Sequence, residues 1–406
     1  MAHATTDPYL LGGALERAAS TSAYSNLSGR DIATFLRLPV TEKKLLREAP
    51  GRFMVPDVRG PALRVQTSGS AGTPVPVYRS SAEFDGNAHA VAERWAGLLT
   101  PGQHRVVSLL DHNAVAAGPL VERVAMSIGG VLARAYPYAA SGPRYEAVGA
   151  LFEEFRPDVV VGTPGEIVDI EDAWRRAGDF ERVRTSVHAV LLLGAPATSG
   201  MRRRIASSWN SAVYDASYGS TEVGTIATGC ADGHLHVLSK RFVLEVRTDE
   251  VSGALTPLVA GVAGELIVTP LHTLSMALVR YASGDRVSAF ECPCGTDGLA
   301  LRVLGRDDDV LFVGESRLGP EEIEGLIFAD PSVQDYHLAC SRDWQLHTVY
   351  LQPFPGQAEA VDVTAITAVW PIAVEVVART PIYARSGGAV KSWRRTRAMR
   401  RSRDDL

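Results

Sequence analysis

Thr67-Ser68-Gly69-Ser70-Ala71-Gly72-Thr73-Pro74 is a stretch rich in glycine and hydroxyl residues between two segments with β character, Leu63 to Val65 and Val75 to Tyr78. This pattern predicts a loop that joins two strands. Glycine lets the backbone turn sharply and approach a ligand, and backbone N–H groups and hydroxyls can then surround phosphate oxygens. No Gly-Lys-Ser/Thr follows, so the stretch is not a Walker loop. Its composition leaves two interpretations open, a phosphate-binding loop and a polar hairpin turn.

The bulk properties of the chain are those of a globular protein with more than one core. At 406 residues we expect two or three packed units. A net charge of −5 argues against a general nucleic-acid or anionic-membrane binder, and no apolar run approaches the length of a membrane helix. The N-terminus shows no secretory signal, and the four cysteines are too few for a disulfide framework. We therefore expect a cytoplasmic protein without nucleic-acid or membrane partners.

The spacing of apolar residues predicts the fold class. Between residues 106 and 214, short buried runs alternate with helical patterns, which predicts an α/β fold with a mostly parallel sheet covered by helices. From about residue 235 the pattern changes to short strands with turns, and beyond 305 to a few strands and a helix. We predict a large N-terminal domain, 1–305, with a β-rich sublobe at about 235–305, and a small α+β C-terminal domain, 306–406.

Polar residues cluster where predicted strands of this sheet end, and ligands of open α/β sheets bind at such ends. Tyr218-Gly219-Ser220-Thr221-Glu222 offers an aromatic face, a hydroxyl and a carboxylate, which suits purine stacking beside a metal-bound phosphate. Asp285, after Tyr281-Ala282-Ser283-Gly284, is placed to accept hydrogen bonds from ribose hydroxyls. A polar turn and an Asx turn are the alternatives for these two segments.

Six segments occur in a fixed order along the chain. They are 67–74, 194–196, 218–222, 281–285, 305–308 and 314–324. In this combination the chain, from about residue 60 to 395, resembles the adenylate-forming superfamily, and more narrowly its phenylacetate–CoA ligase-like branch. The resemblance implies that a carboxylic acid attacks the α-phosphate of ATP in the presence of Mg²⁺. Pyrophosphate leaves, and the acyl-adenylate passes its acyl group to a thiol of CoA or of a carrier-protein phosphopantetheine.

The resemblance also implies roles for individual residues. The β- and γ-phosphates would be held by the loop residues Thr67, Ser68, Gly69, Ser70, Gly72 and Thr73. Adenine would be held by Gly194, Ala195, Pro196 and Tyr218, and the ribose by Asp285 and Arg306. Thr221 and Glu222 would serve the phosphate and Mg²⁺. Asp308 would lie near the hinge of a C-terminal domain that is mobile between the half-reactions.

Two positions depart from the family pattern. Thr73 stands where the family usually has a lysine before the loop's proline. Near the C-terminus the family has a Gly-Lys turn with a catalytic lysine, and here the sequence is Ser386-Gly387-Gly388-Ala389-Val390-Lys391. Without a gap, Ala389 falls on the lysine position, and Lys391 takes the role only if the loop shifts by two residues. A plain solvated lysine is the alternative.

Cysteine and histidine residues suggest a structural zinc site. Cys292 and Cys294 form a close pair, and Cys230 precedes His234 and His236 on a neighbouring β segment. Three sulfurs and one imidazole would close a tetrahedral Zn²⁺ site, with His236 as the preferred ligand and His234 as the alternative. The resemblance points the same way. Three unrelated reduced cysteines remain the competing interpretation.

The acid and the acyl acceptor are less closely defined. His112, at a strand end, and Tyr136 are candidates for the acid pocket, with ordinary hydrogen bonding and sheet packing as alternatives. The branch resemblance favours an aryl or arylacetic acid. The arginine-rich tail, 391–403, is either a solvated end or a contact for CoA phosphates or an acyl-carrier protein.

Rival functions follow from the same features. One is an amide-forming ligase that passes the adenylate to an amine. Another is a non-catalytic nucleotide-binding or carrier-docking protein, which Ala389 favours. The sequence leaves the oligomeric state open.

Overall fold

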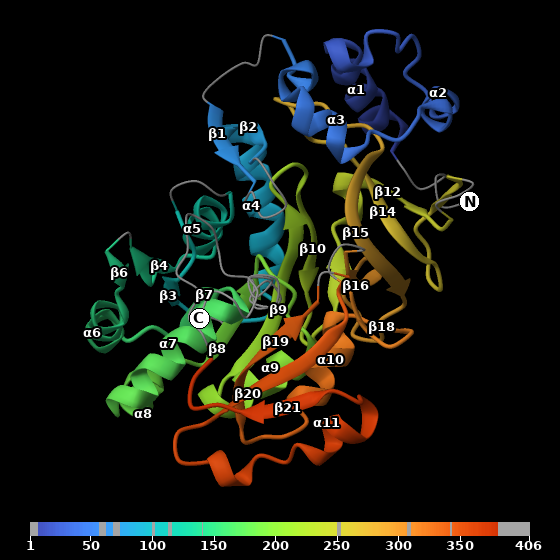
Figure 1. Ribbon diagram of the computed structural model, residues 1–406. Helices are drawn as coiled ribbons and strands as arrows, with labels where there is room; N and C mark the ends of the chain where they lie inside the picture. The colour runs from blue at the N-terminus through green and yellow to red at the C-terminus, as the bar shows by residue number, and fades with distance from the viewer. Residues whose placement is uncertain are drawn as a thin grey trace. The chain divides into compact units, whose positions relative to one another are not determined.

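Figure 1 shows the computed structural model of the chain, which describes residues 7–56, 62–67, 74–99, 102–112, 116–139, 141–249, 253–306, 310–341 and 343–380. The chain divides into two compact units. The first unit is drawn from residues 1–102, 111–129 and 216–303, and the second from 103–110, 130–215 and 304–406. None of the helices in the described ranges is long and apolar enough to cross a membrane.

The second unit contains a parallel sheet. Its strands lie in the order β8-β7-β3-β4, and every neighbouring pair is parallel. All residues of β7 and β8 are buried, as expected for a parallel sheet covered on both faces. The strands of this sheet are β3 (Arg105–Ser108), β4 (Val131–Arg134), β7 (Val159–Gly162) and β8 (Ala189–Leu193). The unit also contains the separate hairpin β5 (Tyr138–Ala139) and β6 (Gly142–Pro143), and the helices α6 (Tyr145–Phe155), α7 (Pro164–Ala177), α8 (Phe180–Arg184) and α9 (Ser199–Trp209). The predicted α/β fold is confirmed.

Local signals at both ends of α7 explain why a helix forms directly after β7. The Thr163 hydroxyl accepts a hydrogen bond from the Glu166 N–H at 3.2 Å, and the Glu166 carboxylate accepts one from the Thr163 N–H at 2.8 Å. This capping box satisfies two N–H groups that have no partner within the helix. Pro164 occupies the first helical position, and Gly178 ends the helix with a φ of 81°.

The chain after residue 304 adds strands and helices to the second unit. The elements are β17 (Leu311–Val313), β18 (Ser316–Leu318), α10 (Pro320–Ile327), β19 (Val333–Cys340), β20 (Leu346–Pro353), η6 (Ala358–Ala360), α11 (Thr364–Val369) and β21 (Ala373–Val376). Strand β20 pairs antiparallel with β19 and parallel with β21. The described part of this segment is α+β, and a separate mobile domain at 306–406 stays a prediction.

The first unit is dominated by antiparallel pairing. The strand order β13-β12-β14-β15-β16-β11-β10-β9 runs through it. Its strands are β9 (Ala212–Ser220), whose first residues belong to the second unit, β10 (Gly224–Gly229), β11 (Leu235–Val237), β12 (Phe242–Arg247), β13 (Leu255–Pro257), β14 (Ala263–Pro270), β15 (Tyr281–Phe290) and β16 (Ala300–Gly305). Within this sheet, antiparallel pairing therefore begins with the β9–β10 hairpin, before the segment of about 235–305 that was predicted to be β-rich.

The remaining elements of the first unit come from the N-terminal third of the chain. They are α1 (Pro8–Ala19), η2 (Ser22–Tyr24), α2 (Ile32–Arg37), α3 (Lys43–Glu48), η3 (Pro50–Phe53), β1 (Ala62–Gln66), β2 (Pro76–Ser80), α4 (Ser81–Trp95) and α5 (Ala117–Ser127), with η4 (Ser239–Arg241) later in the chain. Strands β1 and β2 form an antiparallel hairpin, as predicted for the flanks of the glycine-rich stretch.

Two predicted turns lie partly inside strands. Strand β9 continues to Ser220, so Tyr218 is a strand residue and the turn to β10 begins at Thr221. Similarly, Tyr281 opens β15, and Asp285 lies within that strand. Arg280, the first residue of the predicted turn, has a φ of 49°, and Gly284 inside β15 has a φ of 76° beside a register shift in the β14–β15 pairing. The strand ends, not the choice of residues, are where the prediction was wrong.

We predict that Gly219→Ala destabilises the β9–β10 hairpin. A Cβ on Gly219 would lie 2.2 Å from the Gly224 carbonyl oxygen and 2.8 Å from the Thr225 Cα, so the strands would have to separate. We expect a loss of about 1–3 kcal/mol in unfolding free energy, measured by urea denaturation. Gly51→Ala, where a Cβ meets nothing within 4 Å, is the matched control. Equal stability of the two variants would show that the close approach does not constrain the hairpin.

Candidate active site

Glu222 lies at the centre of a polar cluster in the first unit. Glu222 is 3% exposed. Its carboxylate forms an ion pair with Lys43 Nζ at 3.2 Å and accepts a hydrogen bond from the Tyr281 hydroxyl at 3.1 Å. Arg79 of β2 donates from Nη2 to the carbonyl oxygens of Thr221, at 3.1 Å, and of Glu222. The turn that carries both predicted catalytic residues is therefore held by side chains from α3, β2 and β15.

The partners of Glu222 determine its charge. Burial alone raises the pKa of a carboxyl group, but the positive charge of Lys43 and the hydrogen bonds to the group outweigh it, so the pKa of Glu222 lies below its ordinary value. Glu222 is thus an ionised carboxylate at neutral pH. Carboxylate oxygens are ligands that Mg²⁺ prefers, so the donor type fits the predicted role.

Tyr218 and Asp285 are joined directly. The Tyr218 hydroxyl donates to Asp285 Oδ2 at 2.9 Å, and the Asp285 backbone N–H donates to the Ser283 hydroxyl at 3.1 Å. Sequence analysis assigned the tyrosine to adenine and the aspartate to the ribose as separate predictions. The structure places them on β9 and β15 of one unit and fixes each side chain through the other.

Sequence analysis gave no role to Lys43, Arg79 or Tyr281. Lys43 is the first residue of α3, where the helix dipole disfavours a cation, and this was the signal available in the sequence. Tyr281 stood in a quoted motif without a role. No spacing rule connects residues 43, 79 and 281 to residue 222, because their proximity arises from tertiary structure.

The glycine-rich loop is described at its two ends. Two hydrogen bonds between Thr67 and Val75 join the ends of the loop. The Thr67 N–H donates to the Val75 carbonyl at 3.0 Å, and the Thr67 hydroxyl accepts from the Val75 N–H at 2.9 Å. Several predicted site residues lie outside the described residues: Ser68, Gly69, Ser70, Gly72, Thr73, Asp308, Ala389 and Lys391. Their predicted roles stay predictions.

Other predicted nucleotide residues belong to the second unit. Gly194, Ala195 and Pro196 connect β8 to α9, and Gly194 has a φ of 79°, which favours glycine there. Arg306 follows β16 at the start of the C-terminal segment.

The two predicted acid-pocket residues have different surroundings. His112, in the first unit, has Nδ1 3.8 Å from the Glu122 carboxylate. Tyr136, in the second unit, packs edge-on against Tyr138, with ring centroids 5.5 Å apart. The Tyr138 hydroxyl in turn donates to Asp169. For Tyr136 this is the sheet packing that the sequence left as an alternative, and the assignment of both residues to the acid pocket stays a prediction.

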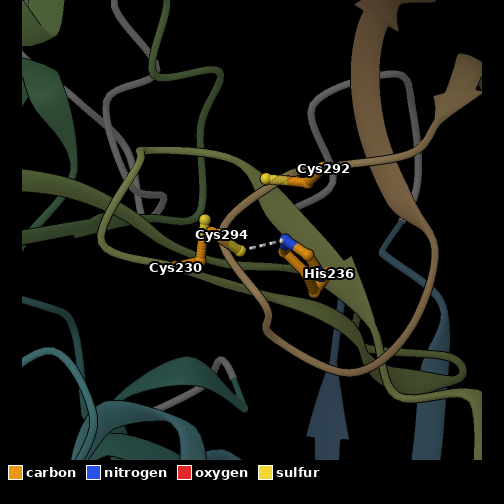
Figure 2. Close-up of side chains that lie close together, drawn as sticks. All are labelled: Cys230, His236, Cys292 and Cys294. Carbon is orange, nitrogen blue, oxygen red and sulfur yellow. Dashed lines mark hydrogen bonds between the residues drawn. The ribbon is translucent and has the colours of Figure 1, made fainter.

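Three of the four cysteines gather with His236 in the first unit (Figure 2). The ligand atoms of Cys230, His236, Cys292 and Cys294 all lie within 4.8 Å of one another. His236 Nε2 faces Cys294 Sγ at 3.3 Å, while His236 Nδ1 lies 2.9 Å from the Gly298 carbonyl oxygen. A ring that donates from Nδ1 to a carbonyl leaves the Nε2 lone pair directed at the cluster, as in metal-bound histidines. Three sulfurs and one nitrogen are a suitable donor set for Zn²⁺.

His234 stands beside this set. Its Nδ1 lies 3.2 Å from Cys292 Sγ, and its ring packs edge-on against Phe290. Hydrogen bonds from Thr296 lower the pKa of the Cys294 thiol to about 6, whereas burial raises the pKa of Cys230 to about 11. The set whose ligand atoms all lie within 4.8 Å of one another includes His236 and not His234, which agrees with the preferred ligand predicted from the sequence.

Comparison with known proteins gives sequence relatives and structural neighbours. No protein-family model matches the chain. Its sequence is similar to the phenylacetate-coenzyme A ligase of Thermus thermophilus, 27% identical over 336 residues that span 80% of this chain and 72% of that protein. The corresponding ligase of Aromatoleum evansii is 26% identical over 329 residues, spanning 79% and 72%. Its fold is similar to 2-hydroxyisobutyryl-CoA ligase in the postadenylation state in complex with 2-HIB-AMP, with a TM-score of 0.77, 18% identity and coverage of 97% of this chain and 90% of that chain.

The α/β fold, the ordered motifs and these relatives agree with the resemblance to the adenylate-forming superfamily. The sequence relatives are phenylacetate-coenzyme A ligases, the branch that the sequence segments indicated. The resemblance inferred from six sequence segments is confirmed.

We predict that Lys43→Met lowers stability most at neutral and alkaline pH. Without the ammonium group, burial raises the pKa of Glu222, so charging this carboxyl destabilises the folded state. The expected loss is about 1–3 kcal/mol at pH 8, measured by urea denaturation. The loss should shrink as pH falls towards 5, because the variant can then protonate Glu222.

Lys44→Met is the control for this experiment, because the Lys44 side chain is 79% exposed and pairs only with Glu48 at the surface. A deficit in Lys43→Met that is the same at pH 5 and pH 8 would contradict the proposed coupling between the two charges.

Proposed function

We propose that the protein activates a carboxylic acid with ATP to an acyl-adenylate and transfers the acyl group to the thiol of CoA. The observation that carries this proposal is the similarity to phenylacetate-coenzyme A ligases over four-fifths of the chain. The fold supports it independently, because the ligase of similar fold is in complex with an acyl-adenylate.

The site chemistry supports the same assignment. Nucleotidyl transfer depends mainly on positioning and on stabilising negative charge. In this proposal Glu222 and Thr221 hold Mg²⁺, which supplies positive charge to the phosphates when bound. Lys43 keeps Glu222 ionised and sets its direction. The Tyr218–Asp285 pair presents an aromatic face and a carboxylate to the nucleoside, and the loop 67–73 binds the outer phosphates.

We propose an aryl or arylacetic acid as substrate, because the sequence relatives are named for phenylacetate. CoA is the favoured acceptor, with a carrier-protein phosphopantetheine as the alternative. The proposal also includes a cytoplasmic location, a mobile C-terminal domain at 306–406 and Lys391 as the catalytic lysine.

Two alternative functions can be distinguished from this proposal. A non-catalytic nucleotide-binding or carrier-docking protein is favoured by Ala389 at the expected lysine position. An amide-forming ligase would share the adenylation step and differ in its product. Each predicts a different result in the experiment below.

We predict acid-dependent release of pyrophosphate from ATP and Mg²⁺, with aryl or arylacetic acids preferred to aliphatic acids. Lys391→Ala should reduce the rate by about 100-fold or more, because it removes a cation that stabilises the developing charge. Lys44→Ala, a surface lysine, should leave the rate unchanged. The measurement is a coupled pyrophosphate assay over a panel of acids.

The product of the second half-reaction separates the rivals. Mass spectrometry should detect an acyl-CoA when CoA is added. An amide formed with an added amine, and no thioester, would favour the amide-forming ligase. ATP binding without pyrophosphate release from any acid would support the non-catalytic protein and contradict the proposed ligase.

We also propose that Cys230, His236, Cys292 and Cys294 hold a structural zinc ion. We expect about one zinc ion per chain in the purified protein, measured by inductively coupled plasma mass spectrometry. Cys294→Ser should lose the metal and lower the unfolding temperature, because the set then lacks one thiolate. Cys340→Ser, a buried cysteine of β19, should keep it. Equal zinc content in both variants would contradict this site.

A further inference from the structure

The nucleotide loop 194–196 of the second unit is followed at once by a contact with the C-terminal segment. Thr198, the N-cap of α9, donates its hydroxyl hydrogen bond to Glu324 of α10 and accepts one from the Met201 N–H at 3.1 Å. The next residue, Ser199, donates from its N–H to the Glu321 carboxylate at 3.1 Å. Two acidic residues of α10 thus bond the first turn of α9.

The two helices approach each other closely at this point (Figure 1). A Cβ on Gly200 would lie 2.5 Å from the Glu324 carbonyl oxygen and 2.8 Å from its carbonyl carbon. Both of these atoms belong to the backbone, so no side-chain rotation could relieve the overlap. Glycine at this position is what allows the carboxyl group of Glu324 to reach Thr198.

The Glu324 carboxyl group accepts hydrogen bonds from two hydroxyl groups and has acidic residues near it. Its side chain is 1% exposed, and its second oxygen accepts the Tyr336 hydroxyl at 2.6 Å. The acidic groups that act on it are Glu321 on α10 and Asp335 on β19, and Glu321 also acts on Asp215 of β9, whose carboxylate lies 4.0 Å from the Arg202 guanidinium of α9. Burial raises the pKa of Glu324 to about 7, and Glu321 and Asp335 act in the same direction.

We propose that Glu324 is a positioning residue that ties the C-terminal segment to the start of α9 and thereby fixes the nucleotide loop 194–196. This inference rests on the proposed function, which gives that loop a nucleotide to bind. The side chain does not touch the reacting atoms. It acts through Thr198, because the N-cap determines how the chain leaves the loop and enters the helix.

The contact depends on pH with a definite sign. A carboxyl group whose pKa is about 7 in the contact and about 4.5 in water binds its proton more tightly when the contact is formed. The contact is therefore strongest at or below pH 4.5, weakens as pH rises from 4.5 to 7, and is constant above that. The equilibrium constant for forming it falls by at most about tenfold per pH unit in this range.

Glutamine is the informative substitution. Its amide imitates the protonated acid, since the oxygen can accept from Tyr336 and the NH₂ can donate to Thr198. Glu324→Gln should keep the contact at every pH, whereas Glu324→Ala removes it. Glu359→Gln makes the same charge change on an exposed residue of η6 and is the matched control.

The test combines hydrogen–deuterium exchange of residues 194–203 with equilibrium binding of a fluorescent ATP analogue. Glu324→Ala should speed exchange of the Ser199 and Met201 amides by about tenfold and weaken ATP-analogue binding by a similar factor. Glu359→Gln should match the wild-type protein at every pH, whereas Glu324→Gln should match it at or below pH 4.5 and be better protected than it at pH 7. Between pH 5 and 7 protection should fall in the wild-type protein and stay constant in Glu324→Gln.

Gly200→Ala supplies a second route, because it separates the helices without changing a titratable group. It should reproduce the exchange and the weakened binding of Glu324→Ala. Wild-type exchange in Glu324→Ala, or an equal loss in Glu324→Gln, would overturn the proposal. So would a pH dependence that survives in Glu324→Gln and disappears in Asp215→Asn.

Exchange and ATP-analogue binding can be measured without catalysis. The role of Glu324 and the proposed ligase function can therefore be contradicted separately. Normal pyrophosphate release together with unaltered exchange and ATP-analogue binding in Glu324→Ala would overturn the role of Glu324 alone. Pyrophosphate release from no acid, with the exchange and binding effects intact, would overturn the proposed function alone.

Discussion

An ionised carboxylate is costly to bury unless charged and hydrogen-bonding partners surround it. In the first unit, several segments of the chain supply such partners to Glu222. Its partners are Lys43 of α3 and Tyr281 of β15, while Arg79 of β2 holds the backbone of the same turn. The β9–β10 turn is therefore defined only when three distant segments are in place. The candidate catalytic carboxylate is set by tertiary structure and not by its own motif.

The Cys/His cluster constrains the same strands at their other ends. β10 starts just after the Glu222 turn and leads into Cys230, while β15 starts with Tyr281 and leads towards Cys292 and Cys294. A metal bound there would tie together the far ends of two strands whose near ends meet at Glu222. The proposed zinc ion would therefore stabilise strands that also carry candidate site residues, and its loss would loosen them.

The sequence predicts features that depend on neighbouring residues better than contacts between residues far apart in the chain. The alternation of buried runs and helical patterns predicts the parallel strands around Val159–Gly162. Residue chemistry selects Tyr218, Glu222 and Asp285, which lie in one unit, and their role at a nucleotide site stays a prediction. The strand ends were placed wrongly, because β9 runs on to Ser220 and β15 begins at Tyr281. Lys43 was missed altogether, because an ion pair across 179 positions leaves no periodic trace in one sequence.

Glu222 and Glu324 are both almost completely buried, yet their surroundings give them opposite charge states. Glu222 has a lysine beside it and is ionised, which would suit the proposed role of holding Mg²⁺. Glu324 is bonded by the hydroxyls of Thr198 and Tyr336 among further acids, which raises its pKa and favours the neutral form. A neutral hydrogen bond costs less to expose to water than a buried ion pair. The second arrangement would therefore suit a contact that forms and breaks, as the proposed mobility of residues 306–406 requires, and the first a contact that persists.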